Sequence, residues 1–205
     1  TETEMKVYLI GDSHSQITFP MLASVLMAEG HIVVGQVSKP GWASYSFTGD
    51  PSAIGAIDVA APDVVIVALG GNNSRLSESY KDDVMDFLNL VGYPNRRVIW
   101  IGPAVSLRED VERRHAWTTD YLKSNLPSDV PFIDGRKYTE TGHRDDLVHF
   151  TREAYQNWVN RMEGEVLAAL RYPPIIYKYR RPVLYTFFAA SFVLFGYQLY
   201  RTYKR

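Results

Sequence analysis

Five short apolar runs, rich in Val and Ile, alternate along this 205-residue chain with segments whose apolar residues recur at helical spacing. The predicted strands cover residues 7–10, 31–37, 64–69, 97–102 and 130–133. The predicted helices cover residues 17–30, 52–61, 78–91, 108–126 and 151–170. Such alternation indicates βαβ units and a mostly parallel five-stranded sheet. We therefore expect an α/β protein, a three-layer α/β/α sandwich.

The turn after the first strand offers a position for a nucleophile. Gly11 ends the strand, and Asp12 and Ser13 follow immediately before a helix. In open α/β sheets, sites form at the carboxyl edge of the strands. A Ser at a helix start also has free backbone N–H groups beside its hydroxyl. The alternative is that Asp12 or Ser13 only caps the helix.

Other polar residues follow later strands, and together with Ser13 they suit acyl transfer. Gly41 follows the second strand, Asn72 the third, and Asp146 and His149 precede the last helix. A Ser nucleophile needs a base, an anion that orients the base, and donors to the oxyanion. His149 can be the base and Asp146 its partner. The N–H groups of Ser13 and Gly41 and the amide of Asn72 can donate to the oxyanion.

Some of these residues also have plainer interpretations. Asp145 competes with Asp146 as the partner of His149, and His149 itself could be a surface cap. Asn72, beside Gly71, could be a turn residue. The remaining histidines show no metal-ligand spacing and are predicted to be structural or solvated: His14, His31, His115 and His143. With no Cys in the chain, neither a thiolate metal site nor a Cys nucleophile is available, and we expect no metal and no cofactor.

Four short blocks of this chain resemble, in order, those of the SGNH (GDSL-like) hydrolase family. They are Gly11-Asp12-Ser13, the Gly41 of residues 39–42, Gly70-Gly71-Asn72-Asn73, and Asp146-Leu147-Val148-His149. The similarity spans roughly residues 5–170, and Gly35 is a second candidate for the Gly of the second block.

The resemblance implies an SGNH/flavodoxin-like fold and a role for each matched residue. It implies that Ser13 is the nucleophile, His149 the base and Asp146 its partner. It also implies that Gly41 and Asn72 complete the oxyanion hole with Ser13. The chain departs from the family pattern at Asn73, where Asp is usual, and at His14, where an apolar residue is usual.

The charge is unevenly distributed along the chain. From Arg171 onward there are seven basic residues and no acidic one, so residues 1–170 carry a net charge of −8. An acidic body argues against a nucleic-acid partner. A basic tail with an apolar centre argues for a membrane. The polar, acidic residues 1–5 lack the pattern of a signal peptide, and we expect none.

Residues 182–200 carry no charge and are flanked by Tyr and basic residues. A helix of about 20 apolar residues spans a bilayer core of about 30 Å, and interfacial Tyr and cations fit its ends. The alternative is an amphipathic helix packed on the body or on a partner. The predicted organisation is an SGNH-hydrolase-like domain (1–170), a basic Pro/Tyr linker (171–181), a single-pass C-terminal anchor (182–200) and a basic tail (201–205). A viral component held on a virion membrane also fits this architecture.

The sequence therefore predicts a membrane-anchored serine esterase acting on acetyl or other acyl esters of a glycan, peptidoglycan or lipid. Polar residues of the expected open loop, Ser44, Ser46 and Thr48, favour a carbohydrate ester. The expected partners are this ester substrate, a lipid bilayer through 182–200 and protein assembly partners. The alternative is a structural or adaptor module of a membrane or virion assembly with little or no turnover, motivated by Asn73 and His14.

Overall fold

The computed structural model describes residues 3–73 and 79–171. The strands are β1 (Lys6–Gly11), β2 (Ile32–Ser38), β3 (Val64–Ala68), β4 (Arg97–Ile101) and β5 (Phe132–Ile133). The helices are α1 (Ser15–Ala28), α2 (Ser44–Thr48), α3 (Pro51–Ala60), α4 (Ser79–Val91), α5 (Glu109–Asn125), α6 (Arg152–Arg171) and the 3-10 helix η1 (Gly135–Tyr138).

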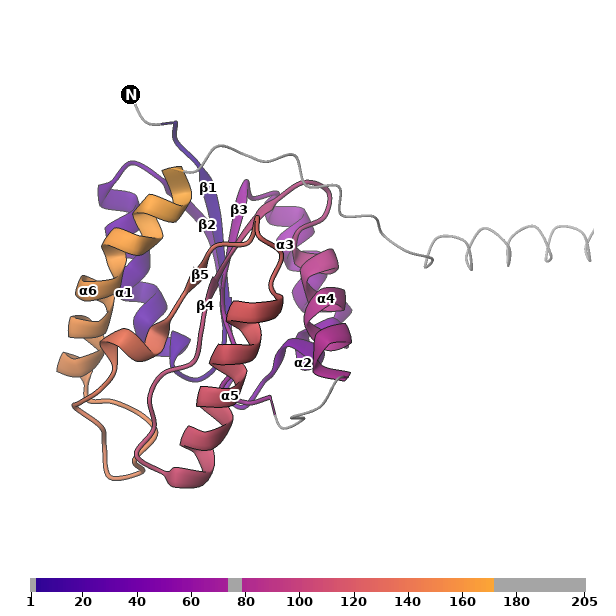
Figure 1. Ribbon diagram of the computed structural model, residues 1–205. Coiled ribbons are helices and arrows are strands. Elements are labelled where there is room, and N and C mark those ends of the chain that lie inside the picture. The colour runs from indigo at the N-terminus through magenta and orange to yellow at the C-terminus, as the bar shows by residue number, and fades with distance from the viewer. Residues whose placement is uncertain (1–2, 74–78, 172–205) are drawn as a thin grey trace, which may run out of the picture.

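The five strands form one sheet in the order β2-β1-β3-β4-β5, and every neighbouring pair is parallel (Figure 1). The predicted parallel sheet is therefore confirmed. Side chains on both faces of the central strands are buried, which explains their continuous apolar runs. In β1, Leu9 faces one apolar core and Ile10 faces the other.

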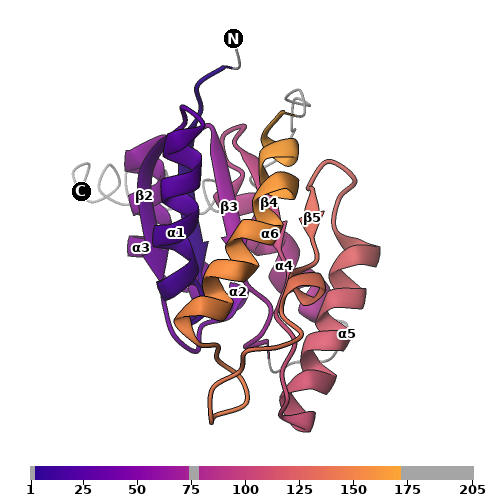
Figure 2. The ribbon, with the colours of Figure 1, turned by 90° about the vertical axis from the view of Figure 1, so that its left-hand side faces the viewer.

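Helices cover both faces of the sheet, as Figures 1 and 2 show. On one face α1 and α6 pack against each other and on the sheet, through residues such as Phe19 and Val159. On the other face, α2, α3, α4 and α5 contribute Phe47, Phe87 and Leu122 among others. The architecture is the expected three-layer α/β/α sandwich.

The last turn of α6 is held by a buried cation from the sheet. Arg97, at the start of β4, is 6% exposed. Its Nη1 donates to the carbonyl oxygen of Leu170 at 2.7 Å, and its Nη2 donates to that of Ala169. The final carbonyls of a helix have no partner within the helix, and a cation there also complements the helix dipole. Arg97 thus ties the end of α6 to β4.

Two predicted loops contain short helices. Residues 40–51 were expected to form an open polar loop, but α2 lies within them because Phe47 is buried and packs on Trp42, with ring centroids 4.9 Å apart. Ser44 is fully buried, and the hydroxyls of Ser46 and Thr48 bond to backbone groups of the same segment. Those hydroxyls therefore do not form the expected polar surface. The 134–145 segment similarly begins with η1.

The predicted C-terminal organisation falls mostly outside the described residues. Helix α6 includes Arg171, where the linker was expected to begin, and residues 172–205, with the predicted span, lie outside the described ranges. Among residues 3–73 and 79–171, no helix is both long and apolar enough to cross a bilayer.

Candidate active site

The predicted site residues lie at the carboxyl edge of the sheet, the lower edge in Figure 1. Ser13 lies in the turn from β1 to α1, and Asn72 follows β3. Asp146 and His149 lie in the loop between η1 and α6. Parallel strands bring all their carboxyl ends to one edge, which is why segments far apart in the sequence meet here.

Ser13, His149 and Asp146 form one hydrogen-bonded line. Nε2 of His149 lies 2.9 Å from Oγ of Ser13, and Nδ1 of His149 lies 2.8 Å from Oδ2 of Asp146. An ionised carboxylate only accepts hydrogen bonds, so Nδ1 carries the proton when the ring is neutral. Nε2 is then free to accept the proton of the Ser13 hydroxyl.

Asp146 is held in its ionised form by the backbone of its own loop. Its Oδ1 accepts from the N–H of His149 at 2.8 Å and from the N–H of Val148 at 3.0 Å. These bonds, with that of His149 first, hold the pKa of the Asp146 carboxyl well below its usual range. Of the two adjacent carboxylates, Asp146 and not Asp145 contacts the imidazole.

The loop that carries Asp146 and His149 contains a residue in the left-handed conformation, Leu147. Leu147 has φ of 62°, a conformation that costs about 1 kcal/mol for a residue with a side chain. Its carbonyl oxygen accepts from the N–H of Leu107 at 2.8 Å and from the hydroxyl of Ser106 at 3.1 Å. The segment before α5 therefore anchors the loop beside Ser13.

The turn that carries Ser13 is tight. A Cβ at Gly11 would lie 2.6 Å from Cβ of Ser15, so only Gly fits there. Oδ1 of Asp12 accepts from the N–H of His14 at 3.1 Å, and the hydroxyl of Ser15 donates to the Asp12 carbonyl at 2.6 Å. The residue at the N-cap position of α1 is His14, and its side chain makes no capping bond. Neither Asp12 nor Ser13 therefore holds the N-cap position, although the Asp12 side chain accepts an N–H group of the turn that leads into α1.

His14 packs directly against the candidate base. Its ring centroid lies 5.0 Å from that of His149, and its Nδ1 lies 2.9 Å from the hydroxyl of Tyr155. Burial first, and then the proximity of His149, lower the pKa of His14 to about 3. His14 is therefore a neutral, structural residue near neutral pH.

Asp12 is the second buried titratable group of this turn. It is 5% exposed, and burial raises the pKa of its carboxyl to about 7. Its Oδ2 accepts a long hydrogen bond of 3.5 Å from Nδ2 of Asn72. Asp12 thus connects the turn of Ser13 to the loop after β3.

Besides Ser13, the candidate oxyanion donors are Asn72, in the loop after β3, and Gly41, in the loop after β2. Nδ2 of Asn72 also donates to the carbonyl of Trp42 at 3.3 Å, which joins its loop to the residue after Gly41. Gly41 is exposed and has φ of 75°, a conformation that favours Gly. The alternative, Gly35, lies inside β2, where it pairs with Tyr8 of β1.

Asn73, the departure from the resembled pattern, is almost completely buried at 1% exposure. Its Nδ2 lies 3.3 Å from Oγ of Ser44, so it joins the loop after β3 to α2. Asn73 therefore supports the loop that carries Asn72.

A hollow of about 280 Å³ opens beside Ser13 and His149. Asn72, Asp12 and His14 also line it. Four further lining residues come from α5 and the residue before it: Arg108, Val111, Arg114 and His115. None of these four was predicted to lie at the site, because the mixed polarity of α5 does not indicate which of its faces meets the sheet edge.

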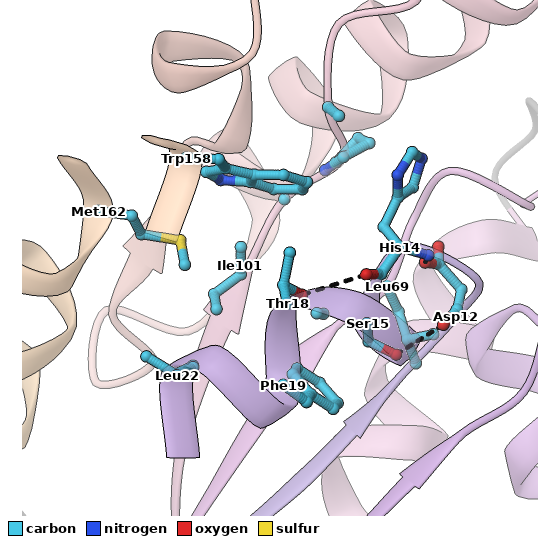
Figure 3. Close-up of a pocket in the computed structure, with 14 residues that line it drawn as sticks. Asp12, His14, Ser15, Thr18, Phe19, Leu22, Leu69, Ile101, Trp158 and Met162 are labelled. Carbon is cyan, nitrogen blue, oxygen red and sulfur yellow. Dashed lines mark hydrogen bonds between the residues drawn. The ribbon is translucent and has the colours of Figure 1, made fainter. Parts of the chain in front are cut away.

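A second, much smaller cavity lies behind the Asp12–Ser15 turn (Figure 3). Its volume is about 20 Å³, and its walls include Thr18 and Phe19 of α1 and Trp158 and Met162 of α6. Because that volume is close to the room needed by one water molecule, an ester cannot enter it. The candidate substrate site is the hollow lined by Ser13, His149 and Asp146.

Clusters of three or more His, Cys, Asp or Glu side chains able to hold a metal ion are not found within residues 3–73 and 79–171. No protein-family model matches the sequence, and no curated protein matches it.

Solved structures of esterases and of an acetyltransferase share the fold. A carbohydrate esterase family 3 protein from Talaromyces cellulolyticus has a TM-score of 0.62 and 19% identity, over 81% of this chain and 98% of the other. The aryl esterase of M. smegmatis has a TM-score of 0.64 and 15% identity, over 82% and 100%. The catalytic domain of peptidoglycan O-acetyltransferase A from Streptococcus pneumoniae has a TM-score of 0.60 and 18% identity, over 83% and 97%. At these identities the likeness concerns the fold.

Proposed function

We propose that this chain is a serine esterase of the SGNH type that hydrolyses acyl esters, with acetyl as the expected acyl group. One observation carries the proposal: the hydrogen-bonded line from Ser13 through His149 to Asp146, beside an open hollow. The shared fold with esterases and an O-acetyltransferase supports the same class of chemistry.

In the first half of the reaction, Oγ of Ser13 attacks the ester carbonyl carbon while Nε2 of His149 takes the hydroxyl proton. The ionised Asp146 stabilises the imidazolium that forms. The carbonyl oxygen becomes an oxyanion, to which the N–H groups of Ser13 and Gly41 and the amide of Asn72 donate in this proposal. The tetrahedral intermediate then collapses, His149 returns the proton to the leaving alcohol, and acyl-Ser13 remains.

In the second half, water replaces the alcohol. His149 takes a proton from the water, whose oxygen attacks the acyl carbon, and the second tetrahedral intermediate releases the carboxylic acid and the Ser13 hydroxyl. Each oxyanion donor is worth on the order of 100- to 1000-fold in rate. This chemistry needs only the side chains already named.

The proposed substrates are esters of a glycan, a peptidoglycan or a lipid. Ser44 is buried against Asn73, and the hydroxyls of Ser46 and Thr48 bond to the backbone of their own segment, so these three side chains do not favour a carbohydrate. The carbohydrate esterase and the peptidoglycan O-acetyltransferase that share the fold now support a glycan ester.

We propose that residues 182–200 anchor the enzyme in a membrane, either of a cell or of a virion. Their length and their lack of charge support this role. An occluded Ser13 would favour the alternative of a structural or adaptor module. Ser13 is instead half-buried and lines the hollow, so the catalytic proposal is better supported.

The test uses the full chain in non-ionic detergent. Hydrolysis of 4-nitrophenyl acetate and labelling by a fluorophosphonate are compared between wild type, Ser13→Ala and Ser24→Ala. Ser24 is exposed on α1, and its hydroxyl donates to the carbonyl of Pro20 in the same helix, so it is a matched control. We expect both signals in wild type and in Ser24→Ala and neither in Ser13→Ala. A folded wild type without either signal would overturn the esterase proposal.

A further inference from the structure

Two arginines that line the hollow beside Ser13 have no part in the proposed mechanism. Arg108 directly precedes α5, and Arg114 lies in its second turn, between Val111 and His115, which line the same hollow. Residues at these spacings share one face of a helix. The first turns of α5 therefore present two cations to the hollow in which the ester would bind.

Arg108 is already engaged. Its Nε and Nη2 donate to the two carboxylate oxygens of Asp110, at 3.2 and 2.8 Å. Its side chain is 51% exposed, so this pair lies at the rim of the hollow. Arg108 supplies local positive charge, but much of that charge is balanced by Asp110.

Arg114 differs from its neighbours on α5. Within residues 3–73 and 79–171, no ion pair of Arg114 is found, and its Nε is buried without a hydrogen-bond partner. The other acids and bases of this region are paired: Arg113 with Glu109 and Glu112 with Arg136. Arg114 thus keeps donors for a further acceptor.

The carboxylates that line the hollow are occupied elsewhere. Oδ1 and Oδ2 of Asp146 bond to the backbone and ring of His149. Asp12 is buried under the turn and bonds to His14 and Asn72. A guanidinium that lines such a hollow, with the nearby carboxylates already bonded to other groups, suits a bound anion.

We infer that Arg114, assisted by Arg108, forms a subsite for a negatively charged group on the ester substrate. The inference rests on the proposed esterase function and narrows its substrate class. An acetyl group is too small to carry a second charge, so the anionic group belongs to the alcohol portion, as a carboxylate or a phosphate. The guanidinium offers two parallel N–H donors to either group.

The test compares two acetate esters of the same shape on the full chain in non-ionic detergent. One is 4-acetoxybenzoate, which carries a carboxylate, and the other is the neutral 4-acetoxybenzamide. Each kcat/KM is divided by the rate of hydroxide-catalysed hydrolysis of the same ester, which removes the difference in leaving group. The ratio of the two normalised values measures recognition of the charge.

We expect wild type to favour the anionic ester by about tenfold or more, the scale of one charge-assisted contact. Arg114→Gln should bring the ratio close to 1, the value for an enzyme that does not recognise the charge. Arg113→Gln, which removes a 74% exposed arginine from the next position of α5, should keep the wild-type ratio. Raising the salt concentration should lower the ratio in wild type and in Arg113→Gln, because salt screens the contact between charges. It should leave the ratio of Arg114→Gln unchanged.

A binding measurement separates this inference from the esterase proposal. Binding of 4-hydroxybenzoate and of 4-hydroxybenzamide is measured on Ser13→Ala, with and without Arg114→Gln. If both esters are hydrolysed, and Arg114→Gln changes neither the kcat/KM ratio nor the ratio of the two binding affinities, the subsite is overturned and the esterase proposal stands. Failure of all hydrolysis, with tighter binding of the carboxylate that depends on Arg114, would overturn the esterase and keep the anion subsite.

Discussion

The backbone N–H of His14 donates to Oδ1 of Asp12 at 3.1 Å, so two buried titratable side chains flank Ser13 in one turn. Burial acts on them in opposite directions. It raises the pKa of Asp12 to about 7 and lowers the pKa of His14 to about 3. Between these values both side chains are neutral in the folded protein, so the turn carries no charge beside Ser13.

This pair has a measurable effect on stability. The Asp12 contribution is complete below its unfolded pKa of 3.8 and is lost as the pH rises to about 7. The His14 contribution is complete above its unfolded pKa of 6.5 and is lost as the pH falls to about 3. From about pH 4 to 6.5 the two slopes, each up to about 1.4 kcal/mol per pH unit, oppose each other.

Removing one member should therefore uncover the slope of the other. Relative to wild type, Asp12→Asn should lose free energy of unfolding as the pH falls from 6.5 to 4. His14→Gln should lose it as the pH rises over the same range. Urea unfolding at pH 4, 5 and 6 measures both slopes, and the double variant should run parallel to wild type. Parallel curves for all four proteins would contradict the paired burial.

Asp146→Asn should abolish most of the turnover while the loop stays folded. The Asn carbonyl can still accept from the N–H groups of Val148 and His149, but its amide nitrogen would face Nδ1 of His149. The imidazole would then present a proton to Ser13 instead of accepting one, and kcat should fall by about 10³- to 10⁴-fold. Asp145→Asn is the matched control and should keep the wild-type kcat. Equal losses in the two variants would reassign the partner of His149.

Asn72→Ala should lower the catalytic rate, whereas Asn73→Ala should lower the stability of the fold. Asn72→Ala removes a proposed oxyanion donor, so kcat should fall about 100-fold or more. Asn73→Ala removes the buried contact with Ser44 and should cost about 1–3 kcal/mol of unfolding free energy. Steady-state kinetics and urea unfolding on both variants test the distinction. A kcat for Asn72→Ala equal to that of wild type would remove Asn72 from the oxyanion hole.

Arg97→Leu should destabilise the whole domain by about 2–4 kcal/mol, because the carbonyls of Ala169 and Leu170 lose their buried donor. Arg97→Lys keeps one charge and should recover part of the loss. The fluorophosphonate labelling rate of the folded fraction should stay unchanged, because Arg97 begins β4 and the site lies beyond its other end. A labelling defect without a change in stability would argue against this structural role.

The positions of Ser13, Asp146 and His149 could be predicted because strand ends and helix starts follow from local patterns, and parallel strands share one edge. The contribution of Arg114 to the hollow could not be predicted. Its orientation depends on how α5 rotates onto the sheet, and the apolar and charged residues of α5 do not separate cleanly. The short helix α2 was missed for a similar reason, since the burial of Phe47 against Trp42 decides it.

Helix α6 starts at Arg152, beside the loop of His149, and ends at Arg171 on the opposite side of the molecule (Figure 2). Its 20 residues separate the two ends by about 30 Å. If the chain is anchored through residues 182–200, as proposed, the chain leaves the domain at the end of α6 that is farthest from His149. An ester that the anchored protein hydrolyses must then reach a site about one α6 length away from the point of attachment.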